Sequence, residues 1–136
     1  MKRIKYLLSA ISMLVFLGAC AGGAPVKNAD GVMTNNAGMT LYTFDKDSAG
    51  SGKSVCNGPC AALWPPLMAG ADDKSAGDWS VVTRDDGAKQ WALKGKPLYL
   101  WVKDQKPGDK TGDGFNNVWH AVKAEAANEP MRASGY

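Results

Sequence analysis

Cysteines are the first residues of this chain whose type and spacing could do chemistry. Cys56 and Cys60 enclose three residues, Asn-Gly-Pro. In an oxidising compartment such a pair forms a disulfide by default, and we expect a structural bond here. A redox dithiol is one alternative, although thioredoxin-like chemistry uses a loop one residue shorter, and unpaired or metal-bound cysteines are another. Ala61 follows Cys60 where c-type haem attachment needs histidine, which excludes that cofactor.

Two aspartates, Asp47 and Asp104, could form a carboxylate pair for general acid–base chemistry. The other interpretation is that each accepts backbone N–H bonds in the loop after its own strand. Nucleophile motifs such as Gly-x-Ser-x-Gly and Ser-x-x-Lys are missing from the chain. We therefore predict a non-enzymatic protein without catalytic residues.

Metal chemistry has few candidate ligands. His120 is the single histidine, which rules out the common zinc spacings. Residues 109–114, Asp-Lys-Thr-Gly-Asp-Gly, imitate the first half of a calcium-binding EF-hand loop, but His120 stands where that loop needs glutamate. Aspartate and glycine are also what tight turns use. We predict no metal and no other cofactor. The open alternatives are calcium in these loops, and copper on His120 with Met33, Met39, Met68 or Met131.

The N-terminal segment indicates where the protein is located in the cell. A cationic start leads into an apolar run and then into small residues before Cys20. The run is too short to span a bilayer, which needs about 20 residues, and it predicts a signal peptide over residues 1–19. The ending Leu-Gly-Ala-Cys resembles the lipobox of bacterial lipoproteins, which implies lipid attachment, such as palmitate, at Cys20. Ala21 differs from the aspartate that resembles an inner-membrane retention signal, so in a Gram-negative source we expect the outer membrane, facing the periplasm or the exterior.

Charge is concentrated in the same segment. Lys2, Arg3 and Lys5 are three of the sixteen cations, and without them thirteen cations face thirteen anions. A balance near zero with no basic cluster argues against nucleic acid as a partner. We expect the membrane to be a partner through the lipid anchor. The other partner classes that the sequence leaves open are an envelope protein, a glycan and a metal.

The remaining chain divides into a tether, one domain and a tail. Small residues with Gly and Pro in 20–30 predict a lipidated N-terminus and tether, and aperiodic residues 127–136 predict a flexible tail. Residues 31–126 predict one small, mainly β domain. A short helix is expected from Pro59 to Trp64 at most, because two prolines follow. Strands are predicted over 31–34, 39–45, 79–84, 89–94, 97–103 and 117–123.

An internal repeat is the most informative pattern. Residues 38–47 and 95–104 both read Gly-x-x-Leu-Tyr-x-aromatic-x-Lys-Asp. We infer a duplication, with two β-rich units at about 31–70 and 79–126 packed about a pseudo-twofold axis around one core. Strand alternation places Tyr42 and Phe44 on one face of the strand and Leu41 on the other.

The repeated signature is Tyr-x-[Phe/Trp]-x-x-Asp, and it occurs as Tyr42, Phe44, Asp47 and as Tyr99, Trp101, Asp104. Together with Cys-x3-Cys-Ala-x-x-Trp-Pro-Pro-Leu and Gly-Lys-Pro-Leu-Tyr, it resembles the bacterial secreted-repeat lipoprotein family with the Tyr-x-[Phe/Trp/Tyr]-x-x-Asp motif. The resemblance covers residues 31–123. It implies an exported lipoprotein and no catalytic residue, because the family is described as predicted lipoproteins of unknown function.

These patterns together predict a lipid-anchored cell-envelope protein that acts as a non-enzymatic binding or structural module. One alternative is a metal-handling or electron-transfer accessory protein of the envelope. Another is glycan or peptidoglycan binding through exposed tryptophans such as Trp79 or Trp101. The glycan alternative predicts two or more tryptophans on the surface, whereas a structural role predicts that nearly all five are buried.

Overall fold

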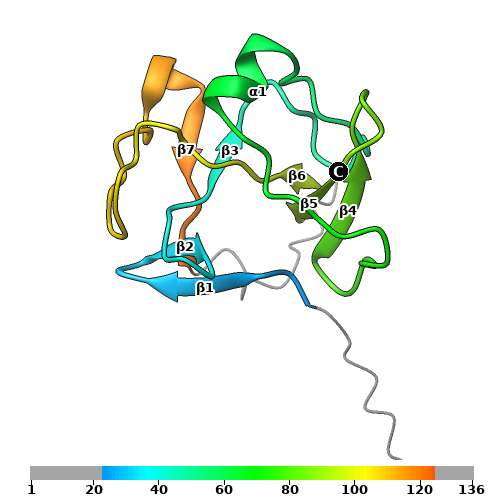
Figure 1. Cartoon of the computed structure of the whole chain (residues 1–136), viewed down its shortest axis with the longest axis horizontal. Helices are drawn as coiled ribbons and strands as arrows, with labels where there is room; N and C mark the ends of the chain where they lie inside the picture. The colour runs from blue at the N-terminus through cyan, green and yellow to red at the C-terminus, as the bar shows by residue number, and fades with distance from the viewer. Residues whose placement is uncertain (1–22, 125–136) are drawn as a thin grey trace, which may run out of the picture.

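Short strands joined by long loops make up residues 23–124, the part of the chain that the computed structural model describes (Figure 1). Within this part, seven strands form three small antiparallel sheets. A five-residue helix and one 3-10 turn lie in the connections between strands. The mainly β class, with one short helix after the cysteine loop, is confirmed. No helix among these residues is long and apolar enough to cross a membrane.

A β-hairpin begins each half of the fold. β1 (Val26–Ala29) pairs with β2 (Val32–Asn35), and β4 (Trp79–Thr83) pairs with β5 (Lys89–Leu93). Figure 1 shows the first hairpin in blue at the bottom and the second in green at the right. The second hairpin was expected from its Asp-Asp-Gly turn, and its strands agree with the prediction within one residue.

The two halves then exchange strands. β3 (Tyr42–Phe44), from the first repeat, pairs with β7 (Trp119–Ala121), from the second. Where the repeats meet, Tyr42 and Tyr99 each donate a backbone N–H to the other's carbonyl, both at 2.9 Å. This reciprocal pair of bonds lies where a pseudo-twofold axis between the repeats would pass.

Equivalent backbone bonds on the two sides support that symmetry. Leu67 N–H donates to the Leu98 carbonyl, and Val122 N–H donates to the Leu41 carbonyl, each at 2.9 Å. Leucines 41 and 98 hold the same position of the repeat, so Leu67 and Val122 are also equivalent. The two units therefore interlock instead of packing as separate bodies.

The predicted side-chain alternation of the motif strands is observed, but the single shared core that we expected is wrong: the two faces enter two separate cores. Tyr42 and Phe44 enter the first core while Leu41 enters the second, and the second repeat divides in the same way. The first core contains Val32, Tyr42, Phe44, Cys56, Trp64, Tyr99, Trp101, Trp119 and Ala121. The second core contains Met33, Leu41, Leu67, Trp91, Leu93, Leu98 and Val122.

Four aromatic rings stack in the middle of the first core. Phe44 stacks on Trp119 at 4.2 Å between centroids, Trp119 on Trp64 at 3.8 Å, and Trp64 on Trp101 at 4.0 Å. Phe44 and Trp101 are equivalent residues, so the stack reads the same from both ends. Each outer ring rests on a tryptophan of the other repeat, which joins the two units through dispersion and apolar burial.

The helix forms where it was expected. α1 (Pro59–Leu63) has Pro59 at its first position, where a missing N–H costs no intrahelical bond, and it ends before Pro65 and Pro66. In the second repeat the corresponding segment is the 3-10 turn η1 (Phe115–Asn117).

The predicted tether over residues 20–30 is wrong in its last part. β1 occupies Val26–Ala29, and Ala24 and Val26 pack against the second core. Small and polar residues there carry no strand periodicity, so only the pairing with β2 reveals the strand. The predicted tail, residues 127–136, and the signal peptide lie outside the described residues.

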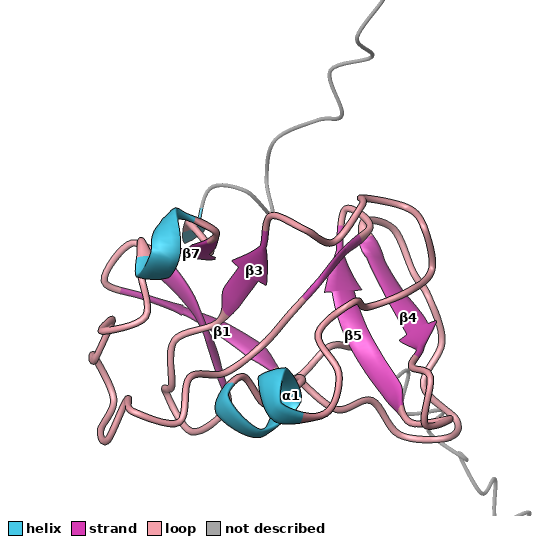
Figure 2. Cartoon of the chain, turned by 90° about the horizontal axis from the view of Figure 1, so that it is seen from above, coloured by secondary structure: helices cyan, strands magenta, loops and turns pink. Residues whose placement is uncertain are grey.

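Several predicted strands are shorter than expected. The segment 97–103 contributes only the end of β6 (Lys96–Pro97). Beyond it, successive N–H groups donate to three different segments: Leu98 to Trp91, Tyr99 to Tyr42, and Leu100 to Pro65. Because each residue has a new partner, no ladder extends, and loops prevail in Figure 2. Changes of partner also shorten the predicted 39–45 and 117–123 to β3 and β7, whereas the predicted 31–34 becomes β2 with its start and end one residue later.

The ring stack generates a test of packing. A Cβ on Gly112 would lie 2.7 Å from Trp64 Cη2 and 3.1 Å from Trp101 Cγ. We expect Gly112→Ala to lower the free energy of unfolding by about 1–3 kcal/mol, the usual cost of overpacking, measured by urea denaturation. Gly70→Ala is the matched control, because its Cβ would meet only the Asp73 side chain, at 3.4 Å from Oδ2. Equal effects of the two substitutions would contradict the stack as described.

Candidate functional site

The tyrosines and aspartates of the repeated motif are bonded across the two repeats. Tyr42 donates its phenolic O–H to Asp104 Oδ2 at 2.6 Å, and Tyr99 donates to Asp47 Oδ2 at 2.5 Å. All four side chains are buried. The motif residues named by the sequence analysis are therefore brought together, but each aspartate is paired with the tyrosine of the other repeat.

Each carboxylate also holds its own loop. Asp47 Oδ1 accepts the N–H of Val55 at 2.7 Å. Asp104 Oδ1 accepts the N–H of Thr111 at 3.0 Å and its hydroxyl at 2.6 Å. The loop-capping interpretation is confirmed. Neither carboxylate has the other among its hydrogen-bond partners, so the structure gives the acid–base alternative no paired site.

Burial sets the protonation of the two phenols. It raises the pKa of Tyr42 and of Tyr99 well above the ordinary value near 10, and the bonds to Asp104 and Asp47 raise each pKa further. Both phenols therefore stay protonated at neutral pH and act as hydrogen-bond donors. A neutral, buried donor fixed on a carboxylate is a structural group and a poor base or nucleophile.

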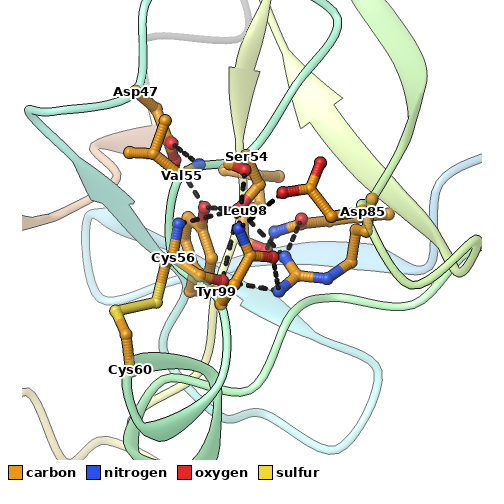
Figure 3. The surroundings of a disulfide bond; sticks show 11 residues. Asp47, Ser54, Val55, Cys56, Cys60, Asp85, Leu98 and Tyr99 are labelled. Atoms are coloured by element: carbon orange, nitrogen blue, oxygen red, sulfur yellow. Dashed lines mark hydrogen bonds between the residues drawn. A yellow bond between two sulfur atoms is a disulfide. The ribbon is translucent and has the colours of Figure 1, made fainter.

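A buried cation from the second repeat, Arg84, completes the site around Asp47 of the first repeat. Arg84 Nη1 donates to Ser54 Oγ at 3.0 Å and to Gln90 Oε1 at 2.7 Å. Ser54 Oγ lies 2.6 Å from the Tyr99 hydroxyl, whose proton goes to Asp47. A chain of hydrogen bonds thus runs from the guanidinium through two hydroxyls to the carboxylate, and Figure 3 shows Tyr99 and Ser54 at its centre. The chain compensates two charges that would be costly to bury alone.

The disulfide lies against this chain. Cys56 and Cys60 are bonded, which confirms the structural interpretation of the pair. The carbonyl of Cys56 accepts Arg84 Nη2 at 2.5 Å, and Asn57 Oδ1 accepts the same nitrogen at 3.3 Å. The disulfide therefore fixes the loop that provides acceptors for the buried Arg84 guanidinium. The same loop leads into α1 (Figure 3).

The remaining acidic residues serve turns and surface contacts. Asp109 accepts the N–H groups of Gln105 and Lys106, and Asp113 Oδ1 accepts the N–H of Ala121 at 2.9 Å. His120 Nε2 lies 2.8 Å from Asp45 Oδ2 on the surface. Residues 23–124 contain no group of three or more His, Cys, Asp or Glu that could hold a metal.

Tryptophan burial goes against the glycan alternative. Four tryptophans are at most 4% exposed, including Trp101, and Trp79 is half-buried. The two or more exposed tryptophans that the glycan alternative requires are not found, and the burial agrees with the structural use of the rings. The rings are used inside the protein because a domain of this size needs large apolar side chains to build its cores.

Sequence reasoning missed three members of the site: Ser54, Arg84 and Gln90. Arg84 comes directly before an Asp-Asp-Gly turn, a context that indicates a solvated hairpin end. Gln90 is fully buried and donates Nε2 to the Leu98 carbonyl at 2.7 Å. Strand alternation places Gln90 on the same face of β5 as Ala92, but the opposite face with Trp91 and Leu93 is buried too, so alternation did not single out Gln90. Cys20, the predicted lipid attachment site, lies outside the described residues.

Comparison with known proteins returns one family. A family model described as a secreted repeat of unknown function matches twice, over residues 24–68 and 80–123. The first match begins ahead of β1, in agreement with the corrected start of the domain. Each match covers one of the two interlocking units. No curated protein and no solved structure matches the chain.

The crossed bonds generate a stability prediction. Tyr42→Phe or Tyr99→Phe leaves a buried carboxylate without its phenol donor, and we expect each to lower the free energy of unfolding by about 1.5–3 kcal/mol. Urea denaturation measures the loss. Asp45→Asn is the control, because it breaks only the exposed pair with His120, for which we expect less than about 1 kcal/mol. A tyrosine variant as stable as this control would contradict the assigned role.

The raised pKa values generate a pH prediction. The folded state holds the two phenolic protons more tightly than the unfolded state, so stability present below about pH 10 should be lost as the pH rises above it. We expect the free energy of unfolding to fall with pH in this alkaline range, with a shallower slope in Tyr42→Phe. Phenolate absorbance should show the two buried tyrosines ionising only on unfolding. Identical slopes in the parent and variant proteins would contradict the prediction.

Proposed function

The chain belongs to the family of secreted repeats of unknown function, and we propose that it is a lipid-anchored, non-enzymatic binding module of the bacterial cell envelope. The membership makes it an exported protein. The crossed Tyr–Asp bonds support the proposal most directly. The tyrosines and aspartates of the repeated signature are all buried and bonded inside the protein, so they hold the scaffold together and leave binding to the surface.

Non-enzymatic action is supported by the state of the reactive groups. The two motif carboxylates are engaged by N–H and O–H donors, the phenols are protonated, and the cysteines of the described part are joined. General acid–base chemistry needs a titratable group within reach of a substrate, and these groups face the interior instead. The site therefore stabilises the fold.

Lipid anchoring at Cys20 is supported by the lipobox-like sequence and by the start of the fold. Because β1 begins at Val26, five residues separate the proposed acylation site from the first strand. The six residue-to-residue steps from Cys20 to Val26 span at most about 20 Å when fully extended. The module is thus held close to the bilayer, which in a Gram-negative source is the outer membrane, given Ala21 after the cysteine.

An electron-transfer accessory role stays a hypothesis, and the four-ring stack is the feature that favours it. The metal-handling alternative has no cluster of ligands to build on in residues 23–124. We therefore keep the binding module as the main proposal, because the buried motif leaves the surface of the protein available for binding.

Acylation provides the test of the address. We expect Cys20→Ser to abolish incorporation of labelled fatty acid and to move the protein out of the membrane fraction, because the thiol is the only attachment point in the lipobox-like sequence. Ser12→Ala, in the same N-terminal segment, should leave labelling unchanged. Persistent acyl labelling of Cys20→Ser would contradict lipid attachment at this residue.

A further inference from the structure

One face of the protein is hollowed between the β5–β6 turn and the β3–β7 pair. The cavity measures about 280 Å³. Its buried lining is apolar, formed by Leu93, Ala121 and Val122, with Thr43 beside them. Its remaining lining consists of three lysines, and no acidic residue takes part: the lysines are Lys94, Lys96 and Lys123.

The pseudo-twofold shows what makes this face different. Thr43 and Leu100 hold the same position in the two copies of the motif. Leu100 packs against the second core, whereas the smaller Thr43 lines the cavity. The duplicated scaffold therefore has a larger apolar side chain on one face and an opening on the other.

Charge follows the same asymmetry. Lys123 comes directly after Val122, and its equivalent, Met68, comes directly after Leu67. After the first hairpin, the segment that corresponds to Lys94–Lys96 reads Ala-Gly-Met, residues 37–39, and contains no cation. Three lysines thus gather on the open face, while the equivalent segments of the closed face carry none.

The backbone adds an independent observation. Lys94 and Gly95 form the two-residue turn between β5 and β6, with φ values of 49° and 80°. Such a turn favours Asn, Asp or Gly at both positions, and Asp30 stands at the first position of the equivalent type of turn after β1. A lysine there strains the backbone, a local cost typical of functional sites.

Lys96 is held in place by the motif loop. Its Nζ donates to the carbonyls of Phe44 at 3.1 Å and Asp47 at 2.7 Å. A fixed ammonium beside the cavity provides positive charge without further loss of side-chain freedom on binding. The scaffold built by the crossed Tyr–Asp bonds thereby positions one of the three charges.

We propose that this cavity binds a small organic anion with one carboxylate on a short apolar body. The apolar lining matches the body, the lysines match the carboxylate, and the volume lies at the lower end for ligand sites. The inference rests on the proposed role as a binding module and names the ligand class of that role.

Octanoate is the probe, titrated into the full chain by calorimetry, with 1-octanol as the uncharged analogue. We expect octanoate to bind, 1-octanol to bind at least about tenfold more weakly, and added salt to weaken octanoate alone. Thr43→Leu, which copies the closed face, should weaken octanoate by at least about tenfold. Lys123→Gln should weaken it by about fivefold, and Lys74→Gln, away from the cavity, should not change it.

Thr43→Leu is expected to fold, because leucine stands at the equivalent position of the second repeat, and its thermal midpoint checks this. Absence of octanoate binding by the parent protein, equal affinity for 1-octanol, or unchanged affinity in folded Thr43→Leu would overturn the proposal. Any of these three results, with Cys20 acylation intact, would reject the ligand class without contradicting the proposal of a lipid-anchored module. Loss of acyl labelling from the parent protein would instead reject the anchoring.

Discussion

Each buried carboxylate of the repeated motif is satisfied by a phenol from the other repeat, 52 or 62 residues away in the chain. A buried carboxylate without its donor would be costly, so neither unit can complete its own motif. The remaining features follow from this crossing. The loops that carry the aspartates, the backbone bonds between Tyr42 and Tyr99, and the ring stack all require both units in place.

Duplication explains how so small a domain obtains two cores. Each repeat contributes a hairpin, a motif segment and a final segment, and the motif segment of one pairs with the final segment of the other. The four stacked rings alternate between repeats across the central Trp64–Trp119 contact. Large aromatic side chains supply the buried apolar area that a domain of about a hundred residues with short strands would otherwise lack.

Once the shared core is fixed, the two outer faces are free to differ. The first repeat carries the disulfide loop that accepts the buried Arg84 of the second repeat, and the second carries a 3-10 turn where the first has α1. The cavity beside Thr43 is a divergence of the same kind, since one smaller residue and three lysines distinguish it from its counterpart. Function in such a protein is expected on the faces where the copies differ, because the positions where they agree are occupied by structure.

Local signals in the sequence determined the hairpin around the Asp-Asp-Gly turn, the helix between Pro59 and Pro65, the disulfide, and the two-faced motif strands. Turn residues, proline and alternation act through neighbours in the chain, so no tertiary knowledge is needed to interpret them. The duplication was also visible, because it is a property of the sequence itself.

Only the tertiary structure decided which tyrosine meets which aspartate, that Arg84 is buried, that β1 belongs to the domain, and that one face stays open. These outcomes depend on partners far away in the chain, and strand segments that change partner at every residue leave no periodic pattern. The residues around Arg84 indicate a hairpin end, and they would be the same whether its guanidinium faced water or the buried hydroxyls of Ser54 and Tyr99. Burial and pairing are set by the total packing of both repeats, which no single segment of the sequence contains.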